Sequence, residues 1–181
     1  ICYCNKKSVI YKLSSYLASL GYCARRINCM VYMGIDPGKN GGIAFLIKKD
    51  YEDTVLAYPF SEDILIDKIN ELCIKHHIEC VVEDVHAMPH QGVVSMFNFG
   101  KNFGFIQGCL RSFEIDFKLV SPIKWKKELN VTSDKNTSIA RCKELFPEVN
   151  LLKNKRCRKE HDGMAEAVLL AEYCRRSYVK A

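Results

Sequence analysis

Four acidic residues in this sequence have the types and spacing needed to bind divalent metal ions. Asp36 and Glu83 each end a short apolar run, and Asp162 and Glu166 lie four residues apart at the start of a predicted final helix. Carboxylates crowded together without a cation raise one another's pKa, whereas their oxygen atoms are good ligands for Mg²⁺ or Mn²⁺. Four such groups predict two Mg²⁺ ions, for which Mn²⁺ can substitute, and such a pair can activate water for phosphodiester cleavage.

The turn after Asp36 bears on what this carboxylate does. Residues 36–42 read Asp-Pro-Gly-Lys-Asn-Gly-Gly between two apolar runs, a pattern that predicts a strand, a tight turn and a second strand. Glycine permits the sharp turn and leaves room above the carboxylate. Asp36 then either holds a metal ion or only accepts hydrogen bonds within its own turn, and both interpretations stay open for this stretch alone.

Hydrophobic periodicity predicts an α/β fold for the rest of the chain. Strands are expected at 31–36, 42–48, 53–58, 78–83 and 115–120, and helices at 61–77, 93–113, 121–125, 134–146 and 162–176. The mostly apolar run 78–83 suits a central parallel strand, and ligands in open α/β sheets gather at the carboxyl ends of such strands. If the first strand lies beside the fourth, and the final helix packs across both, the four acids converge.

The segment 93–113 has two further features. Gly100, Gly104 and Gly108 repeat at every fourth residue, which in a chain without membrane character predicts close packing against another element. The segment is also more apolar than a solvent-facing helix, so part of it is expected to meet a partner subunit.

Composition limits the class of protein. The 181 residues, 48% hydrophobic and 27% charged, suit one globular domain, here predicted at 30–181. No apolar run approaches the roughly 18 residues of a membrane helix, so no membrane association is expected. Ten cysteines without a CxxC pair predict buried free thiols in a reducing compartment inside the cell, such as the cytoplasm or nucleoid.

Residues 1–29 stand apart from this domain. They contain five basic residues and no acid, and without them 22 basic residues face 21 acidic ones, so the net charge of +6 does not itself indicate a nucleic-acid partner. We expect sequence read through in frame upstream of a start at Met30 or Met33. A transit segment, which would direct the protein to an organelle, and an accessory DNA-binding extension are the alternatives.

From Met33 to about Tyr173 the chain resembles the RuvC-like Holliday junction resolvases of the RNase H superfamily. The resemblance rests on Gly-Ile-Asp-Pro-Gly at 34–38, Val-Glu-Asp-Val at 82–85 and His-Asp-Gly-Met-Ala-Glu-Ala at 161–167. Ser-Pro-Ile-Lys-Trp-Lys at 121–126 resembles the phage and plastid branch. The last two acids are four apart here and often three apart in the family, which leaves the roles of His161, Asp162 and Glu166 open.

The resemblance implies an RNase H-like fold, with a mixed five-stranded sheet flanked by helices. It implies a magnesium-dependent homodimer that cuts two opposing strands of a four-way DNA junction, as in recombination and repair. The metal ligands would be Asp36, Glu83, Asp162 and Glu166, with His161 also in the catalytic set. DNA contacts are expected from local basic clusters and from aromatic rings that stack on unpaired bases: Phe97, Phe99, Lys124, Lys126, Lys135, Lys155, Arg156, Arg158 and Lys159.

Three other functions are compatible with parts of this pattern. The turn at 36–42 also resembles the phosphate loop of the actin and sugar-kinase fold, but those proteins need two such domains. A binding module that recognises junctions without cutting them would not need all four acids. An RNase H-like nuclease acting on RNA or an RNA–DNA hybrid would have the same metal site, so it stays the main alternative.

Overall fold

The computed structural model describes residues 29–38, 40–48, 53–86 and 92–179 of the chain. The strands are β1 (Met30–Asp36), β2 (Gly42–Ile47), β3 (Thr54–Pro59), β4 (His77–Glu83) and β5 (Asp116–Val120). The helices are α2 (Glu62–Cys73), α3 (Val93–Ser112), α4 (Pro122–Glu128), α5 (Lys135–Leu145) and α6 (Asp162–Val179). The predicted extension at 1–29 lies almost entirely outside the described residues.

The five strands form one mixed sheet in the order β3-β2-β1-β4-β5. β1, β2 and β3 are an antiparallel meander, whereas β1 pairs in parallel with β4, and β4 with β5. The register aligns Ile35 with Val82, so β1 and β4 end at the same edge. The predicted mixed sheet, with the first strand beside the fourth, is therefore confirmed.

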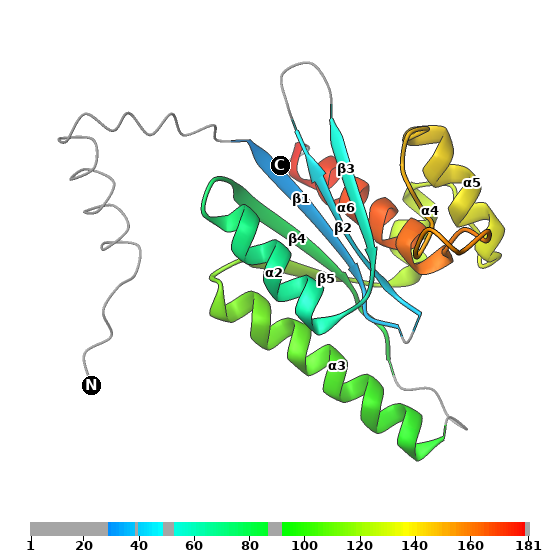
Figure 1. Cartoon of the computed structure of the whole chain (residues 1–181). Coiled ribbons are helices and arrows are strands. Elements are labelled where there is room, and N and C mark those ends of the chain that lie inside the picture. Colours follow the sequence, from blue (N-terminus) through cyan, green and yellow to red (C-terminus); the bar gives the residue numbers. More distant parts are fainter. Residues whose placement is uncertain (1–28, 39, 49–52, 87–91, 180–181) are drawn as a thin grey trace, which may run out of the picture.

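Helices cover both faces of the sheet, with α2 and α3 on one side and α4, α5 and α6 on the other (Figure 1). Because side chains alternate along a strand, each central strand contributes to both layers. In β1, Met33 and Ile35 belong to the core under α2 and α3, whereas Tyr32 belongs to the core under α6. The same alternation directs Asp36 toward the α6 side, together with Glu83, which is two residues beyond Val81 of the α6 core.

Glycine brings α6 unusually close to the sheet. A Cβ atom on Gly34 would overlap the backbone of Ala167 and Ala171 in α6, and one on Gly163 would overlap the carbonyl of Asn40. The first contact draws the middle of α6 onto β1, and the second draws its first turn onto the turn after β1. The acids at the start of α6 are thereby brought to the end of β1.

Two predictions about helices were wrong. Helix α2 ends at Cys73 and not near His77, which instead begins β4. The glycine repeat of α3 is not a packing surface within the described chain, because a Cβ on Gly100, Gly104 or Gly108 would meet no atom within 4 Å. The three glycines do recur along the helix at every fourth residue, but in the described structure they face open space.

The cysteines and the membrane prediction can also be compared with the structure. The described cysteines are free thiols, and four of them are buried. Burial raises the pKa of Cys142 and of Cys174 to about 12, as expected for thiols that serve as packing groups. Among the described residues, no helix is both long and apolar enough to cross a membrane.

Candidate active site

Two buried carboxylates lie at the shared carboxyl edge of β1 and β4. Asp36 is 8% exposed and Glu83 is 7% exposed. Asp36 Oδ1 accepts a hydrogen bond of 3.0 Å from Gly38 N, and Glu83 Oε1 accepts one of 2.9 Å from Trp125 Nε1. The hydrogen bond within the turn, considered as the alternative for Asp36, is thus present, but it occupies only one carboxylate oxygen.

These two carboxylates carry an electrostatic cost in the absence of a cation. Burial, reinforced by the nearby charge of Glu83, raises the pKa of Asp36 to about 7, even though the Gly38 hydrogen bond opposes this. Burial also raises the pKa of Glu83, although the Trp125 hydrogen bond opposes it. A positive charge at this edge would stabilise the ionised form of both groups.

The acids of α6 are, in contrast, paired with lysines. Glu166 Oε1 receives Lys126 Nζ at 2.9 Å and the hydroxyl of Ser138 at 3.1 Å. Asp162 Oδ2 forms an ion pair with Lys135. This pair lowers the pKa of Asp162, outweighing the partial burial that raises it. Ammonium groups are therefore paired with the two acids on the helix, whereas among the described residues neither Asp36 nor Glu83 forms an ion pair.

His161 has a structural contact that its position in the motif did not indicate. Its Nδ1 accepts a hydrogen bond of 3.2 Å from Met164 N, and its carbonyl accepts one of 3.2 Å from Ala165 N. His161 therefore caps the first turn of α6. Partial burial lowers the pKa of its imidazole, which favours the neutral form that this cap requires.

The donor set suits a hard divalent cation, but it is not assembled around one. All four candidate ligands are carboxylates, which is the chemistry preferred by Mg²⁺ and Mn²⁺. Across the described ranges, no group of three or more His, Cys, Asp and Glu side chains is close enough to hold a metal ion. The two lysine ion pairs occupy oxygens that such an ion would compete for.

The chain was compared with known proteins. No protein-family model matches it, and no curated protein matches it in sequence. In three-dimensional structure, however, the chain is similar to two solved structures of RuvC from Thermus thermophilus. The structure of T. thermophilus RuvC in complex with a Holliday junction substrate has a TM-score of 0.55 and 12% identity, covering 83% of this chain and 95% of that one. A second T. thermophilus RuvC structure has a TM-score of 0.53 and 15% identity, covering 82% and 97%.

The chain has a RuvC-like fold. Both neighbours are matched over nearly their whole length, with TM-scores above 0.5. At this identity the likeness concerns the fold, so the assignment of individual site residues stays a prediction. The relation to the phage and plastid branch also stays a prediction.

The predicted basic contacts fall into two groups in this RuvC-like fold. Lys126 and Lys135 form ion pairs with the acids of α6, as described, and of the two only Lys126 is largely covered, whereas Lys135 is exposed. The other five are exposed: Lys124, Lys155, Arg156, Arg158 and Lys159. Only the second group is free to meet a phosphate without first breaking an ion pair of the site.

The loop before α6 forms one wall of an open groove. An isolated antiparallel bridge between Leu152 and Glu160 closes the base of the loop. Arg158 and Lys159 line a groove of about 910 Å³, together with side chains of α5 that include Lys143. Glu160 in this groove is paired with Lys143 at 2.8 Å. The groove begins next to His161 and carries a net positive charge, which suits a nucleic-acid backbone.

The two predicted aromatic contacts have different environments. Phe97 is 72% exposed on α3, beside the exposed Val93 and Val94. Phe99 is partly buried, stacks on Phe103 with ring centroids 6.0 Å apart, and lines a pocket of about 550 Å³ that also borders Pro37. A ring in that pocket lies near Asp36, whereas Phe97 belongs to an exposed apolar surface.

Proposed function

We propose that this protein is a magnesium-dependent endonuclease that resolves four-way DNA junctions by paired nicks. The observation that carries the proposal is the pair of buried carboxylates, Asp36 and Glu83, at the shared edge of two parallel strands and facing the acid-bearing helix α6. Buried carboxylates whose pKa values are raised by burial and by a neighbouring acid are typical of functional sites. The likeness to RuvC bound to a Holliday junction supports the choice of substrate.

The acids have a defined role in this proposal. Asp36, Glu83, Asp162 and Glu166 would hold two Mg²⁺ ions, which supply a nucleophilic water and stabilise the leaving oxygen when bound. A cation bound by Glu166 and Asp162 would weaken their ion pairs with Lys126 and Lys135, and DNA phosphates would then be suitable partners for the two lysine charges. His161 orients the first turn of α6 through its cap, and a direct catalytic role stays a prediction.

DNA is held by the chain's exposed basic residues. Arg158 and Lys159 in the groove, with Lys155 and Arg156 close to them in sequence, would contact phosphates and position the branched substrate, and Lys124 on α4 would add a further contact. Phe99, in its pocket next to the turn after β1, would stack on an unpaired base at the crossover. We expect this machinery to lie wholly within residues 30–181, and a chain starting at Met30 should cut junctions as the longer one does.

The enzyme would act as a homodimer. Symmetric cutting of two strands needs two active sites related by a two-fold axis. The exposed apolar residues Val93, Val94 and Phe97, on the part of α3 that projects past the sheet (Figure 1), support this helix as the contact between subunits.

The test is cleavage of a labelled four-way junction with Mg²⁺, beside linear duplex and an RNA–DNA hybrid. We expect paired nicks in the junction, and Asp36→Asn should abolish them while junction binding persists, because the basic contacts are unchanged. Preferential cleavage of the hybrid would favour the RNase H-like alternative, which the same acids also support. Tight junction binding without cleavage in any divalent metal would indicate a binding module.

A further inference from the structure

Helices α4 and α5 supply hydrogen-bond donors to the two glutamates of the site. Trp125 of α4 donates its indole N–H to Glu83 at 2.9 Å, and Ser138 of α5 donates its hydroxyl to Glu166 at 3.1 Å. Both donors have no solvent exposure. A buried N–H or O–H destabilises a protein unless it finds an acceptor, so each donor is fixed on its glutamate.

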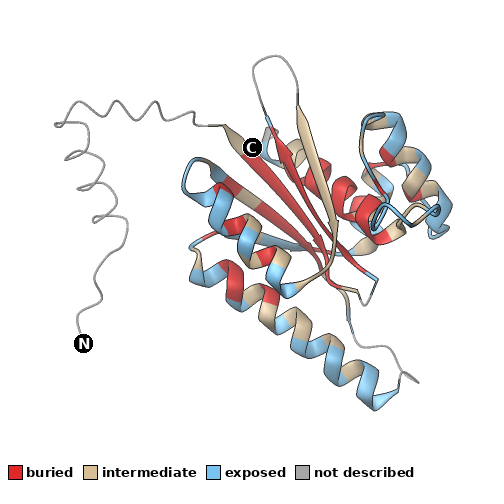
Figure 2. Cartoon of the chain, viewed as in Figure 1, coloured by how far each residue is buried: buried red, intermediate tan, exposed pale blue. Residues whose placement is uncertain are grey.

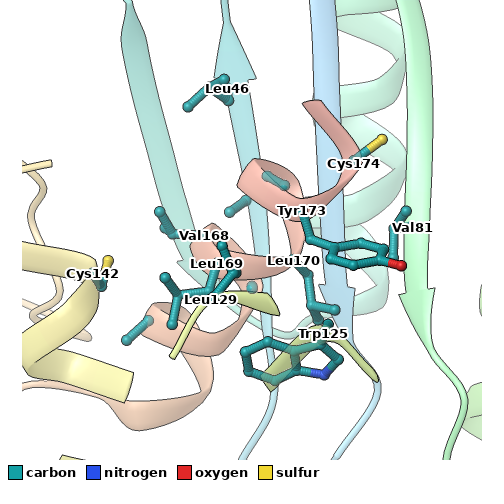
Figure 3. Packing of buried hydrophobic residues seen from close by; sticks show 14 of the residues in the cluster. Leu46, Val81, Trp125, Leu129, Cys142, Val168, Leu169, Leu170, Tyr173 and Cys174 are labelled. Atoms are coloured by element: carbon teal, nitrogen blue, oxygen red, sulfur yellow. The ribbon is translucent and has the colours of Figure 1, made fainter. Parts of the chain in front are cut away.

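The chain path explains why Trp125 reaches Glu83. In the sheet, Val120 at the end of β5 is aligned with Glu83, and its carbonyl accepts a hydrogen bond of 2.7 Å from Asp84 N. Pro122 begins α4 two residues later, so Trp125 lies in the first turn of a helix that starts beside the carboxylate. Figure 3 shows the indole among the buried side chains near α6.

Each of these glutamates uses one oxygen for its internal donors. Glu83 Oε1 accepts from Trp125, and Glu166 Oε1 accepts from both Ser138 and Lys126. In the described part of the chain, Oε2 of each glutamate has no hydrogen-bond partner. Carboxylates that bind metals are themselves commonly hydrogen-bonded in this way, and removing such a partner lowers metal affinity by roughly 10- to 100-fold.

We propose that Trp125 and Ser138 are positioning residues that orient Glu83 and Glu166, so that the second oxygen of each is presented to a divalent cation. The inference rests on the proposed function, because it takes the glutamates as metal ligands. It also gives a reason for a tryptophan in this core cluster: phenylalanine would fill much of the same space without introducing a buried donor.

The test uses Trp125→Phe, which keeps an aromatic ring and removes the N–H, and Ser138→Ala, which removes only a hydroxyl. Binding of Mn²⁺ to the DNA-free protein is followed by the electron paramagnetic resonance signal of the free ion. We expect each variant to lower Mn²⁺ affinity by about 10-fold or more. Binding of the junction in EDTA should change by less than about two-fold, since neither residue touches the exposed basic surface.

Leu129→Val is the matched control for Trp125→Phe, because Leu129 is buried in the same cluster and its aliphatic side chain has no donor for Glu83. It should leave Mn²⁺ affinity unchanged. In a Glu83→Gln background, Trp125→Phe should have no further effect on Mn²⁺ affinity, because the group that it orients has gone. A general loosening of the core would instead add to the effect of Glu83→Gln.

Several outcomes would overturn the inference. Unchanged Mn²⁺ affinity in both folded variants, or an equal loss in Leu129→Val, shows that the donors serve packing alone. If Trp125→Phe fails to fold, the Mn²⁺ affinity of Ser138→Ala alone tests the inference. If the unaltered protein cuts junctions and binds Mn²⁺, and both variants bind Mn²⁺ equally well, only this inference fails and the proposed function stands. If the unaltered protein binds no Mn²⁺ at about 10 mM, the metal part of the proposed function fails with it.

Discussion

Helices α6 and α3 have similar lengths, and each is associated with glycines, but they meet the rest of the chain in opposite ways. α6 is buried along most of its course, whereas the N-terminal half of α3 is largely exposed or half-buried (Figure 2). The glycine contacts of α6, at Gly34 and Gly163, admit no side-chain atom, whereas Gly100, Gly104 and Gly108 on α3 face open space. A glycine in a sequence is therefore evidence of close packing only where another element is known to lie against it.

This difference separates two tasks within one fold. The tight contact of α6 with β1 fixes where Asp162 and Glu166 stand relative to Asp36, so it determines the candidate chemistry. The exposed face of α3 contributes nothing to that placement, and its apolar residues instead suit assembly with a second copy. Substitutions at the two helices should therefore have different and separable consequences.

The largest effect is expected from Gly34→Ala. The added methyl group would overlap backbone atoms of Ala167 and Ala171, which cannot move aside as a side chain can. We expect a loss of more than about 4 kcal/mol in the free energy of unfolding, which leaves a marginally stable domain mostly unfolded. Urea denaturation followed by circular dichroism measures it, and a loss under about 1 kcal/mol would contradict the tight contact.

The second-largest effect concerns Asp36 and how the stability of the fold depends on pH. The folded pKa of Asp36 is about 7, above its unfolded value of 3.8, so the folded protein binds the proton more tightly. Stability in EDTA should therefore fall as pH rises from about 4 to about 7 and stay level above that. Asp36→Asn should remove the part of this loss that Asp36 causes, gaining at most roughly 4 kcal/mol at pH 8 and little at pH 4, at 1.36 kcal/mol per pKa unit, whereas the part due to Glu83 should remain.

Urea unfolding of both proteins across this pH range checks the prediction. Glu114→Gln, an exposed position far from the site in sequence, is the control for a general change of charge. A constant difference between the Asn variant and the unaltered protein at every pH would show that Asp36 does not titrate in this window.

On the α3 side, Phe97→Ser should weaken self-association and leave the fold intact. Burying a phenylalanine side chain contributes about 1.5–3 kcal/mol, so we expect the dimer dissociation constant to rise by about 10-fold or more. Sedimentation equilibrium measures it. Ile74→Ser removes an equally exposed apolar side chain that follows α2, and it should have no effect. Equal association of all three proteins would exclude the Phe97 surface from the interface.

The smallest effect is expected from Gly104→Ala. No atom lies within 4 Å of the added methyl group, and alanine is favoured over glycine inside a helix by about 0.8–1 kcal/mol. At concentrations where the chain is monomeric, the free energy of unfolding should rise by about that amount. A loss of stability in the monomer would show that the α3 face is packed after all.

Much of this arrangement follows from local patterns in the sequence. The ends of β1 and β4 were predicted from apolar runs that stop at Asp36 and Glu83, and strand alternation then directs both acids to one face. Helix α6 was predicted from its periodicity, with Asp162 at its start. These features depend on neighbours within a few residues, which is the range over which periodicity carries information.

The partners of the acids could not be predicted in that way. Trp125 is 42 residues from Glu83, and Lys126 is 40 residues from Glu166. Lys126 and Lys135 were predicted to touch DNA, because a basic cluster looks the same whether it faces solvent or a carboxylate. One signal was present: Trp125 is the only tryptophan, in the first turn of a helix that directly follows β5.

The central place of β1 bears on how the chain is synthesised. Among the described elements, β4, the parallel neighbour of β1, follows β1 by more than 40 residues, and α6, which covers β1, follows all the others. Contacts of such long sequence separation are slow to form, because the entropy of closing a long loop opposes them, and those with α6 cannot form before α6 has left the ribosome. A nascent chain that still lacks α6 therefore cannot carry the four acids as one assembled set.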